Sequence, residues 1–167
     1  MSDTEMDIIH DHSMTAHRRP KVLMNTCGHI AGAAYYYQLR DGQMDEDGEE
    51  WNPPPANDNL KFIGLSLHPR FGGHFAFRSV LAFPSVLLDP LFEWKKAVGV
   101  LKTIEEKRDA LEKFNYAWRD SRFRDFGNPV EKYSKTQLDY FGKPPSERWE
   151  VIRYWVEDDC SHRVYIG

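Results

Sequence analysis

The segment HPRFGGHFAFR, residues 68–78, constrains the fold most, because two adjacent glycines separate two stretches in which apolar residues alternate with others. Side chains on a strand point alternately to its two faces, so the alternation over residues 61–68 and 74–83 predicts two strands. A short connection that contains glycine is typical of a tight turn between neighbouring strands. The sequence therefore predicts an antiparallel hairpin.

The register of this hairpin is open. A connecting loop of residues 70–73 places Ser66 opposite Phe77, whereas a loop longer by one residue places Ser66 opposite Ala76. A shift of one residue exchanges the two faces of a strand, so the two alternatives predict different neighbours for Ser66.

Residues 21–38 contain no proline and follow Pro20, which suits the start of a helix, so a helix of about five turns is predicted there. Its side chains are unusually small, which allows another backbone or a flat ligand to approach closely. Tight packing of helices is the alternative explanation. The small residues are Cys27, Gly28, Ala31, Gly32, Ala33 and Ala34.

Further helices are predicted from their N-terminal signals. Thr103 and Ser134 each precede a glutamate or glutamine by three residues, which is the capping-box pattern. Proline-led starts predict a short helix within residues 89–100 and a last helix from residue 144. Apolar residues follow Thr103 at helical spacing and form a stripe: Ile104, Leu111, Phe114 and Trp118.

Two strands with several helices predict the α+β class, and two strands alone make a thin sheet, so further strands or a second chain are expected. The chain has 167 residues, enough for one domain, which we place at residues 18–157. Residues 1–17 are polar and predict a loosely held arm. Residues 40–59 predict a long surface loop, and residues 158–167 a tail.

Composition excludes several function classes. The net charge of -4 and the pI near 6.0 argue against a nucleic-acid partner. Two distant cysteines suggest neither a disulfide framework nor a thiolate zinc site, and a reducing, cytosolic location fits best. No signal-peptide pattern and no apolar run of about 20 residues occurs, so no membrane partner is expected.

Arginines make the first candidate site. A charged arginine on a strand is costly to bury unless an anion meets it, and guanidinium groups bind carboxylates at two points. Convergence of several arginines would hold a ligand with more than one carboxylate. The alternative is a local ladder of salt bridges with Asp120 and Asp125. The candidates are Arg78, Arg119, Arg122, Arg124 and Arg148.

Histidines and tyrosines give weaker signals. The spacing of the histidines and aspartate in residues 10–17 fits no standard ligand pattern, so no metal site is predicted. His29 alone suggests a satisfied core or surface histidine, and Tyr35, Tyr36 and Tyr37 suggest core packing. The familiar nucleotide-binding, hydrolase and zinc-protease motifs do not occur.

Three ordered blocks resemble the methylmalonic aciduria and homocystinuria type C (MMACHC) family of cobalamin-processing proteins. They are HRRPKVLMNTCGHIAGAAYYYQ, LSLHPRFGGHFAFR, and ALEKFNYAWRDSRFRDFGNPVEKYS followed by YFGKPPSERW. The resemblance covers about residues 7–155. It implies a nitroreductase-like fold in which an antiparallel sheet packs with helices. It also implies a cytosolic enzyme, a cyanocobalamin reductase and alkylcobalamin dealkylase, that binds cobalamin base-off.

The resemblance also implies ligands and residues. Reduced flavin, FMN or FAD, would supply electrons for loss of cyanide, and glutathione would accept alkyl groups. Glutathione would be bound by Arg78, Arg124 and Arg148, with Tyr133 nearby. His29 lies near the cobalamin site and is the one catalytic candidate, and cobalt is held by the corrin rather than by a protein metal site. Cobalamin would contact Asp11, Val22, Leu23, Met24, Asn25, Tyr36, Tyr37, Gln38, Ser66 and Phe77.

The resemblance has consequences for the hairpin and for the role of the chain. Contacts at both Ser66 and Phe77 favour the shorter hairpin loop. His74 and Ser121 stand where the family has tryptophans. The family has more residues before the point at which this chain starts, so we expect part of the fold to be absent. A non-catalytic cobalamin carrier or partner-binding module is therefore the alternative function.

Two protein partners are expected. The type D cobalamin-trafficking protein (MMADHC) is the partner that the resemblance implies. A homodimer is the other, because exposed sheet edges can pair between two copies and replace missing strands. A homodimer without cobalamin chemistry would be a purely structural domain, which is a further alternative for the role of this chain.

Overall fold

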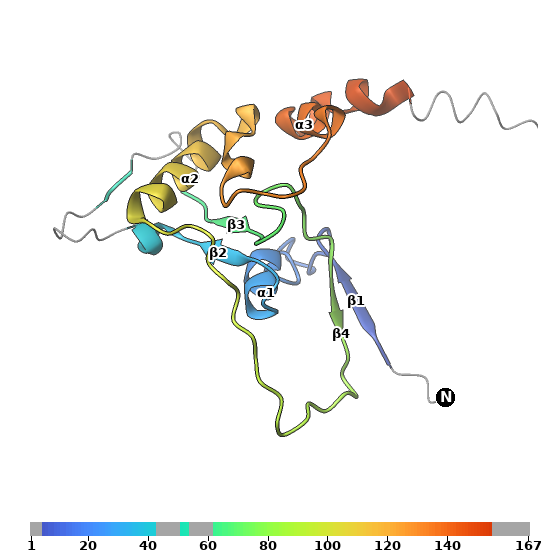
Figure 1. Ribbon diagram of the computed structural model, residues 1–167. Helices are drawn as coiled ribbons and strands as arrows, with labels where there is room; N and C mark the ends of the chain where they lie inside the picture. Colours follow the sequence, from blue (N-terminus) through green and yellow to red (C-terminus); the bar gives the residue numbers. More distant parts are fainter. Residues whose placement is uncertain (1–4, 43–50, 54–61, 155–167) are drawn as a thin grey trace, which may run out of the picture.

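The computed structural model describes residues 5–42, 51–53 and 62–154 (Figure 1). The strands are β1 (Asp7–His10), β2 (Tyr35–Tyr37), β3 (Leu65–Leu67) and β4 (Ser79–Ala82), and the helices are α1 (Met24–Ile30), α2 (Ile104–Tyr116) and α3 (Lys135–Gly142). Short 3₁₀ turns lie at Leu39–Gly42, Trp118–Asp120, Arg122–Asp125 and Pro145–Glu147, and residues 149–154 are helical. Helices mixed with small antiparallel sheets confirm the α+β prediction at this level.

The four described strands form two separate two-stranded sheets. β1 pairs antiparallel with β4, with Ile8 opposite Leu81, and β2 pairs antiparallel with β3, with Tyr36 opposite Ser66. The predicted hairpin is therefore wrong, and neither of its registers occurs. Both of its strands exist, but each pairs with a strand that lies earlier in the chain.

The chain between β3 and β4 makes a tighter turn than the hairpin required. His68 and Gly72 exchange both backbone hydrogen bonds, at 2.8 and 2.9 Å. Gly73, the next residue, makes its backbone hydrogen bond to a segment outside both sheets. There the Gly73 N–H donates to the Arg124 carbonyl at 2.9 Å. Because this contact ties the turn to a distant segment, β4 is directed away from β3 and toward β1.

The long helix predicted over residues 21–38 is also wrong. Only α1 is helical, and the chain reverses after it to return as β2. Gly32 has a φ of 74°, a left-handed conformation that favours glycine, and the three tyrosines that follow have high β propensity. The small residues do allow a close approach. A Cβ on Gly28 would lie only 2.1 Å from Cζ of Phe77.

Three further expectations need correction or lie outside the described residues. Residues 7–10 of the predicted loose arm form β1, which is paired along its length with β4. No helix forms within residues 89–100, a stretch that the structure describes in full. Of the predicted loop over residues 40–59, positions 43–50 and 54–59 lie outside the described residues, as does the tail of residues 158–167.

Both predicted capping boxes are confirmed. The Thr103 side chain accepts a hydrogen bond from the N–H of Glu106, whose carboxylate accepts one from the Thr103 N–H in return. Ser134 and Gln137 make the same reciprocal pair at the start of α3. Local hydrogen bonds thus fix where these two helices begin.

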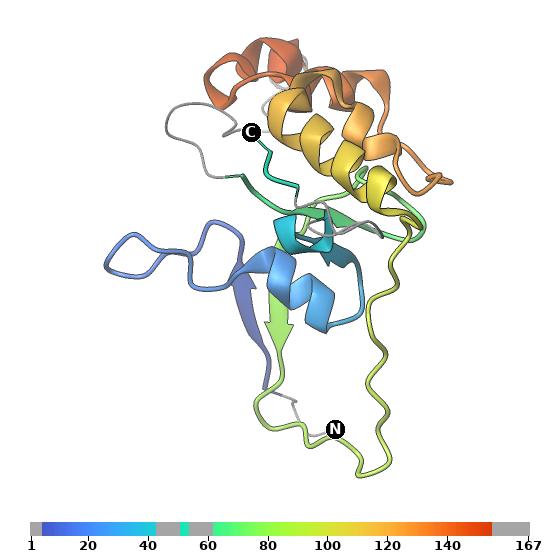
Figure 2. The same ribbon diagram turned by 90° about the vertical axis from the view of Figure 1, so that its left-hand side faces the viewer.

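The core lies where α2 packs on the sheet of β2 and β3, and α1 lies on the opposite side of this sheet (Figures 1 and 2). Tyr37 is only 1% exposed, and its hydroxyl accepts a hydrogen bond from the Leu101 N–H at 2.9 Å. Leu111 of the predicted apolar stripe is fully buried. The core cluster consists of Tyr37, Leu65, Leu67, Leu101, Ala110, Leu111 and Phe123.

Candidate functional site

A cavity of about 290 Å³ lies where the chain enters α1. Its lining includes Tyr36 of β2 and Asp11, the residue that directly follows β1. Six of the ten residues predicted to contact cobalamin line it: Asp11, Val22, Leu23, Met24, Asn25 and Tyr36. Pro20 and Thr26 complete the lining. Three of the four predicted segments therefore contribute to this cavity. The fourth, with Ser66 and Phe77, does not line it.

Ser66 is attached to the rim of this cavity. Its hydroxyl donates to Oδ1 of Asn25 at 3.1 Å, and it lies opposite Tyr36 across the β2–β3 pair. Asn25 is exposed and lies in the first turn of α1, but its side chain has a fixed partner on β3. This bond fixes one wall of the cavity.

A second cavity, of about 240 Å³, shares Met24 with the first. Small residues of α1 and the turn after it form one wall, and Phe77 with β4 forms the other. The small residues therefore allow the Phe77 side chain to lie close to α1, and the remaining space forms this cavity. Its lining consists of Met24, Cys27, Gly28, Ala31, Ala33, Phe77, Ser79, Val80 and Leu81.

Two of the predicted contacts lie elsewhere. Tyr37 is a core residue whose side chain is buried under α2, so its ring does not reach either cavity. The Gln38 N–H donates to Oδ2 of Asp41 at 2.6 Å, within a 3₁₀ turn. For Tyr37 the sequence default, core packing, describes the side chain correctly.

His29 holds the backbone of β2 in place. Its Nδ1 accepts a hydrogen bond from the Tyr36 N–H at 3.1 Å, and its ring lies edge-on to Tyr35 at 4.9 Å. Because a backbone N–H can only donate, the neutral ring carries its proton on Nε2. These contacts make His29 a support for Tyr36 rather than a lining residue of the cavity.

Arg124 is the half-buried arginine of the predicted anion site. Its Nη1 donates to the Gly73 carbonyl at 2.5 Å, and its guanidinium lies 4.7 to 5.3 Å from the rings of Phe123, Tyr133 and Phe141. Its buried Nε has no hydrogen-bond partner among the described residues. Burial lowers the pKa of Arg124, Tyr133 opposes this shift, and Arg148 adds to it. A half-buried cation with an unsatisfied donor is suited to an incoming anion.

Arg148, in the segment after α3, contacts one of the same rings. Its guanidinium carbon lies 5.1 Å from the ring of Tyr140 and 5.9 Å from that of Phe141, and its Nε donates to the Lys143 carbonyl. Since Arg148 lowers the pKa of Arg124, the two cations also act on one another electrostatically.

Arg78 approaches from β4 and is mostly exposed. Its Nη1 donates to Oδ2 of Asp11 at 3.1 Å, which lowers the pKa of that carboxyl. Burial raises the pKa of the Tyr133 hydroxyl, and the charges of Arg124 and Arg78 both oppose that shift. Arg124 and Arg148 both lie against the ring of Phe141, which stacks on Tyr133 with centroids 5.1 Å apart, and the charge of Arg78 also acts on Tyr133. Asp11 joins this arginine cluster to the first cavity.

The alternative of a salt-bridge ladder is correct for one arginine only. Arg122 pairs with Asp120 at 2.7 Å, whereas Asp125 pairs with Lys132 and contacts His74. Arg124 makes no ion pair among the described residues.

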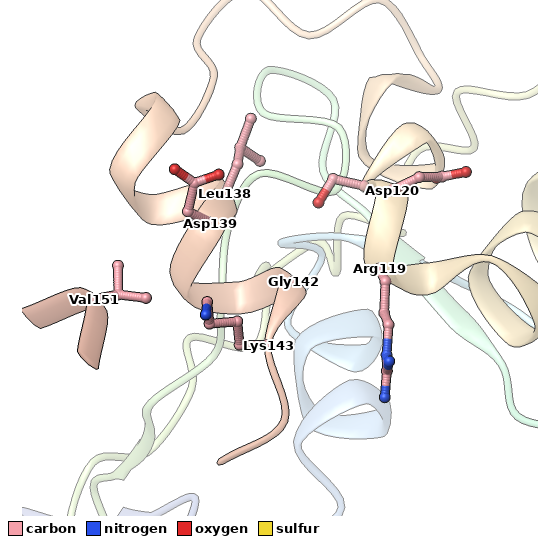
Figure 3. Close-up of a pocket in the computed structure, with 8 residues that line it drawn as sticks. Arg119, Asp120, Leu138, Asp139, Gly142, Lys143 and Val151 are labelled. Carbon is pink, nitrogen blue, oxygen red and sulfur yellow. The ribbon is translucent and has the colours of Figure 1, made fainter. Parts of the chain in front are cut away.

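A third cavity, of about 480 Å³, lies between the turn at Trp118–Asp120 and α3 (Figure 3). Its walls carry both charge signs, with Arg119 and Lys143 on one part and Asp120 and Asp139 on another. Arg119 stacks on the ring of Trp118, with its guanidinium carbon 5.2 Å from the ring centroid. Arg119 therefore belongs to a separate surface and not to the cluster around Tyr133.

Sequence reasoning missed one buried residue near the cluster. His74 is 6% exposed and hydrogen-bonds both to Asp125 and to the Tyr133 N–H. The alternating pattern placed it on a strand. Two signals could have singled it out: its position directly after the glycine pair, and its replacement of a tryptophan that the resemblance implies.

Two general findings concern the described residues only. No group of three or more histidine, cysteine, aspartate or glutamate side chains is arranged there to hold a metal ion. No helix in that part of the chain is long and apolar enough to cross a membrane.

Comparison with known proteins identifies relatives over almost the whole chain. The model of the methylmalonic aciduria and homocystinuria type C family matches residues 1–152. An "MMACHC-like protein" of Caenorhabditis elegans is 58% identical over 163 residues, which are 96% of this chain and 58% of that protein. The human "cyanocobalamin reductase / alkylcobalamin dealkylase" is 38% identical over 91% of this chain and 50% of its own length.

A solved structure is similar as well. The crystal structure of a C. elegans B12-trafficking protein CblC, described as a homologue of human MMACHC, superposes with a TM-score of 0.80 at 55% identity. The superposition covers 98% of this chain and 58% of that one. The chain thus spans between half and three fifths of the length of these relatives.

Proposed function

This chain belongs to the methylmalonic aciduria and homocystinuria type C family, and we propose that it binds cobalamin and removes its upper axial ligand. Cyanide leaves by reduction, and alkyl groups are transferred to glutathione. Relatives named cyanocobalamin reductase / alkylcobalamin dealkylase, 38 and 40% identical to this chain, support the proposal.

The observation that carries the proposal is the first cavity. Six residues assigned to cobalamin contact by resemblance come from different segments, yet they line one space at the start of α1. Ser66 lies on its rim through Asn25, and Phe77 lines the neighbouring cavity, which shares Met24. Together the two cavities offer a mainly apolar surface with few polar groups, the usual lining of a small-molecule site.

The arginine cluster supports glutathione as the second ligand. Glutathione carries two carboxylates, and a guanidinium fork can bind each of them at two points. Arg124 provides a half-buried charge with an unsatisfied donor, Arg148 lies against the same ring of Phe141, and the charge of Arg78 acts on Tyr133. Since Arg78 also contacts Asp11 of the first cavity, the thiol and the corrin would be held next to each other.

The dealkylation step is a transfer of an alkyl group from cobalt to sulfur. The glutathione thiolate attacks the cobalt-bound carbon, a carbon–sulfur bond forms, and the cobalt–carbon bond breaks with its electron pair left on cobalt. The arginines fix the thiol by its carboxylates, and the cavity fixes the corrin, so the protein contributes mainly position and charge. Binding the cobalamin base-off, without its lower ligand, makes the cobalt a better leaving group. The cofactor and the thiol supply the bond-breaking chemistry.

In the same proposal, the electrons for the release of cyanide would come from reduced flavin, FMN or FAD. The nitroreductase-like fold and a cytosolic location are part of the same proposal. So are two protein partners, the type D cobalamin-trafficking protein and a second copy of this chain. Exposed apolar side chains between β4 and α2, such as Leu87 at 92% and Leu91 at 88%, support contact with another protein surface.

The experiment is a thiol-dependent dealkylation assay. Purified protein is incubated with methylcobalamin and glutathione, and S-methylglutathione is quantified by mass spectrometry. We expect product with the wild type and with Arg122→Ala, because Arg122 is exposed and paired with Asp120, and loss of product with Arg124→Ala. Equal rates in all three proteins would contradict a role for the arginine cluster.

The same assay separates the second candidate function. A cobalamin carrier or partner-binding module predicts binding of cobalamin without any product. A spectrum that shows base-off cobalamin, together with no S-methylglutathione from folded wild-type protein, would therefore replace the enzymatic proposal with the carrier.

A further inference from the structure

His74 connects two segments that are far apart in the sequence. It follows the glycine pair at the end of the turn at residues 68–73, and its side chain is only 2% exposed. Nδ1 accepts a hydrogen bond from the Tyr133 N–H at 3.2 Å, and Nε2 lies 3.1 Å from Oδ1 of Asp125. Because the backbone N–H can only donate, Nδ1 carries the lone pair, and the proton of the neutral ring lies on Nε2 and is donated to Asp125.

Asp125 has a second partner that secures this tautomer. Nζ of Lys132 donates to the same Oδ1 at 2.7 Å. The carboxylate is therefore held in its charged form from two sides, and its pKa is lowered by hydrogen bonds from Lys132 and His74 although partial burial opposes this. A charged Asp125 keeps the proton of His74 on Nε2, and this leaves Nδ1 free to accept from Tyr133.

Tyr133, whose N–H is bound by His74, also lies next to Arg124. The ring of Tyr133 lies edge-on to the His74 ring at 5.6 Å, stacks on Phe141, and lies 5.3 Å from the Arg124 guanidinium. Gly73, the neighbour of His74, bonds to Arg124 twice, through its N–H and through its carbonyl. One short turn thus fixes both the arginine and the ring beside it.

We propose that His74 is a positioning residue for the thiol site, in which its neutral ring holds Tyr133 so that the Arg124 guanidinium is oriented toward a carboxylate of glutathione. The inference deepens the proposed function and rests on it. His74 touches neither substrate, and it acts through Tyr133 and Asp125.

The geometry makes the site sensitive to protonation of His74. A second proton would have to go on Nδ1, which would then face the Tyr133 N–H with a hydrogen of its own and break that bond. The charged groups that face the ring are Asp125, which favours protonation, and Arg124 and Lys132, which oppose it. Burial is the largest effect and lowers the pKa of His74, so the neutral form persists below the usual histidine range.

Glutathione itself does not titrate in the relevant range. Its carboxylates have pKa values of about 3 to 4, and its thiol and amino group titrate near or above about 8. A fall in glutathione affinity between about pH 7.5 and pH 5 therefore reports on the protein. Among the groups that surround Arg124, His74 is the one whose ordinary pKa of about 6.5 lies in that interval.

Three substitutions test the proposal. His74→Asn keeps an acceptor near the position of Nδ1, His74→Gln keeps a donor near the position of Nε2, and His74→Phe keeps neither. Glutathione affinity is measured by titration calorimetry across about pH 5 to 8, and cobalamin binding is measured by visible absorption. Thermal unfolding establishes that each variant is folded.

We expect His74→Phe and His74→Gln to weaken glutathione binding about tenfold at neutral pH, because the Tyr133 N–H loses its acceptor. His74→Asn should stay within about threefold of the wild type and should lose the decline in affinity at acidic pH. Cobalamin binding should be unchanged in all three. If His74→Phe does not fold, the Asn and Gln variants and the pH profile decide the question.

Two results would overturn the inference. One is glutathione affinity of the wild-type level in His74→Gln or in folded His74→Phe. The other is equal weakening in the Asn and Gln variants with a flat pH profile in the wild type, which describes a residue that only stabilises the fold. Failure of the proposed function looks different, since wild-type protein would then bind no glutathione at any pH and Arg124→Ala would change nothing. That result removes the thiol site and the inference with it.

Discussion

Replacing Arg124 by methionine should weaken glutathione binding strongly and leave the fold nearly unchanged. The guanidinium lies near three aromatic rings, and its buried Nε has no hydrogen-bond partner in the described part of the chain. A hydrogen bond to a charged group contributes about 1.5 to 3 kcal/mol. Loss of one such bond to a glutathione carboxylate corresponds to an increase in Kd of about 10- to 150-fold.

The effect on stability should be small because two contributions oppose each other. Methionine loses the bond from Arg124 to the Gly73 carbonyl, which costs about 1 kcal/mol or more. It also removes a half-buried charge that has no carboxylate partner in the described part of the chain, which relieves a desolvation cost, and its thioether suits the ring-lined space. We expect the free energy of unfolding to change by no more than about 1 to 2 kcal/mol.

Titration calorimetry with glutathione measures the affinity, and urea denaturation measures the stability. The matched control is Arg122→Met, two residues away, where the side chain is 63% exposed and paired with Asp120. The control should bind glutathione with the wild-type Kd. A role of Arg124 in glutathione binding is refuted if Arg124→Met binds as tightly as the wild type, or if both variants lose affinity equally.

Three further predictions follow from single contacts. Asp11→Asn removes the carboxylate that pairs with Arg78 in the free protein. Glutathione affinity, measured by calorimetry, should therefore rise about two- to fivefold. An unchanged or weaker affinity would contradict the role of Arg78. Tyr37→Phe leaves the buried Leu101 N–H without its acceptor. Urea denaturation should show a free energy of unfolding lower by about 1 to 3 kcal/mol, and a change below about 0.5 kcal/mol would count against the contact. Burial lowers the folded-state pKa of His74, so the unfolded chain binds more protons in acid; stability should be full above about pH 6.5 and fall as pH decreases toward the lowered pKa. This decrease in Tm should be smaller in His74→Asn, and equal slopes in the two proteins would contradict it.

Elements fixed by local contacts could be predicted from the sequence, and elements fixed by distant contacts could not. The capping boxes at Thr103 and Ser134 involve residues three apart, and both helices begin where predicted. The partner of β4 is β1, about 70 positions earlier, and no local pattern identifies it. The helix prediction over residues 21–38 failed because the positive φ of Gly32 ends α1 and reverses the chain.

The candidate site divides in the same way. The residue types of the arginine cluster, and the small side chains of α1, could be found in the sequence. Their distribution could not. Arg119 and Arg124 are five residues apart, yet Arg119 lines the third cavity and stacks on Trp118, whereas Arg124 lies against Phe123, Tyr133 and Phe141. His74 was missed because its importance comes from contacts to Asp125 and Tyr133, more than 50 residues away.

The central claim is that the cavity at the start of α1 binds cobalamin, and the visible spectrum of methylcobalamin tests it most directly. Addition of wild-type protein should shift the spectrum to that of the base-off form. Asn25→Trp, which fills the cavity, should abolish the shift, and Leu87→Trp, on the exposed β4–α2 connection, should retain it. An unchanged spectrum with folded wild-type protein, or a full shift with Asn25→Trp, would contradict the account.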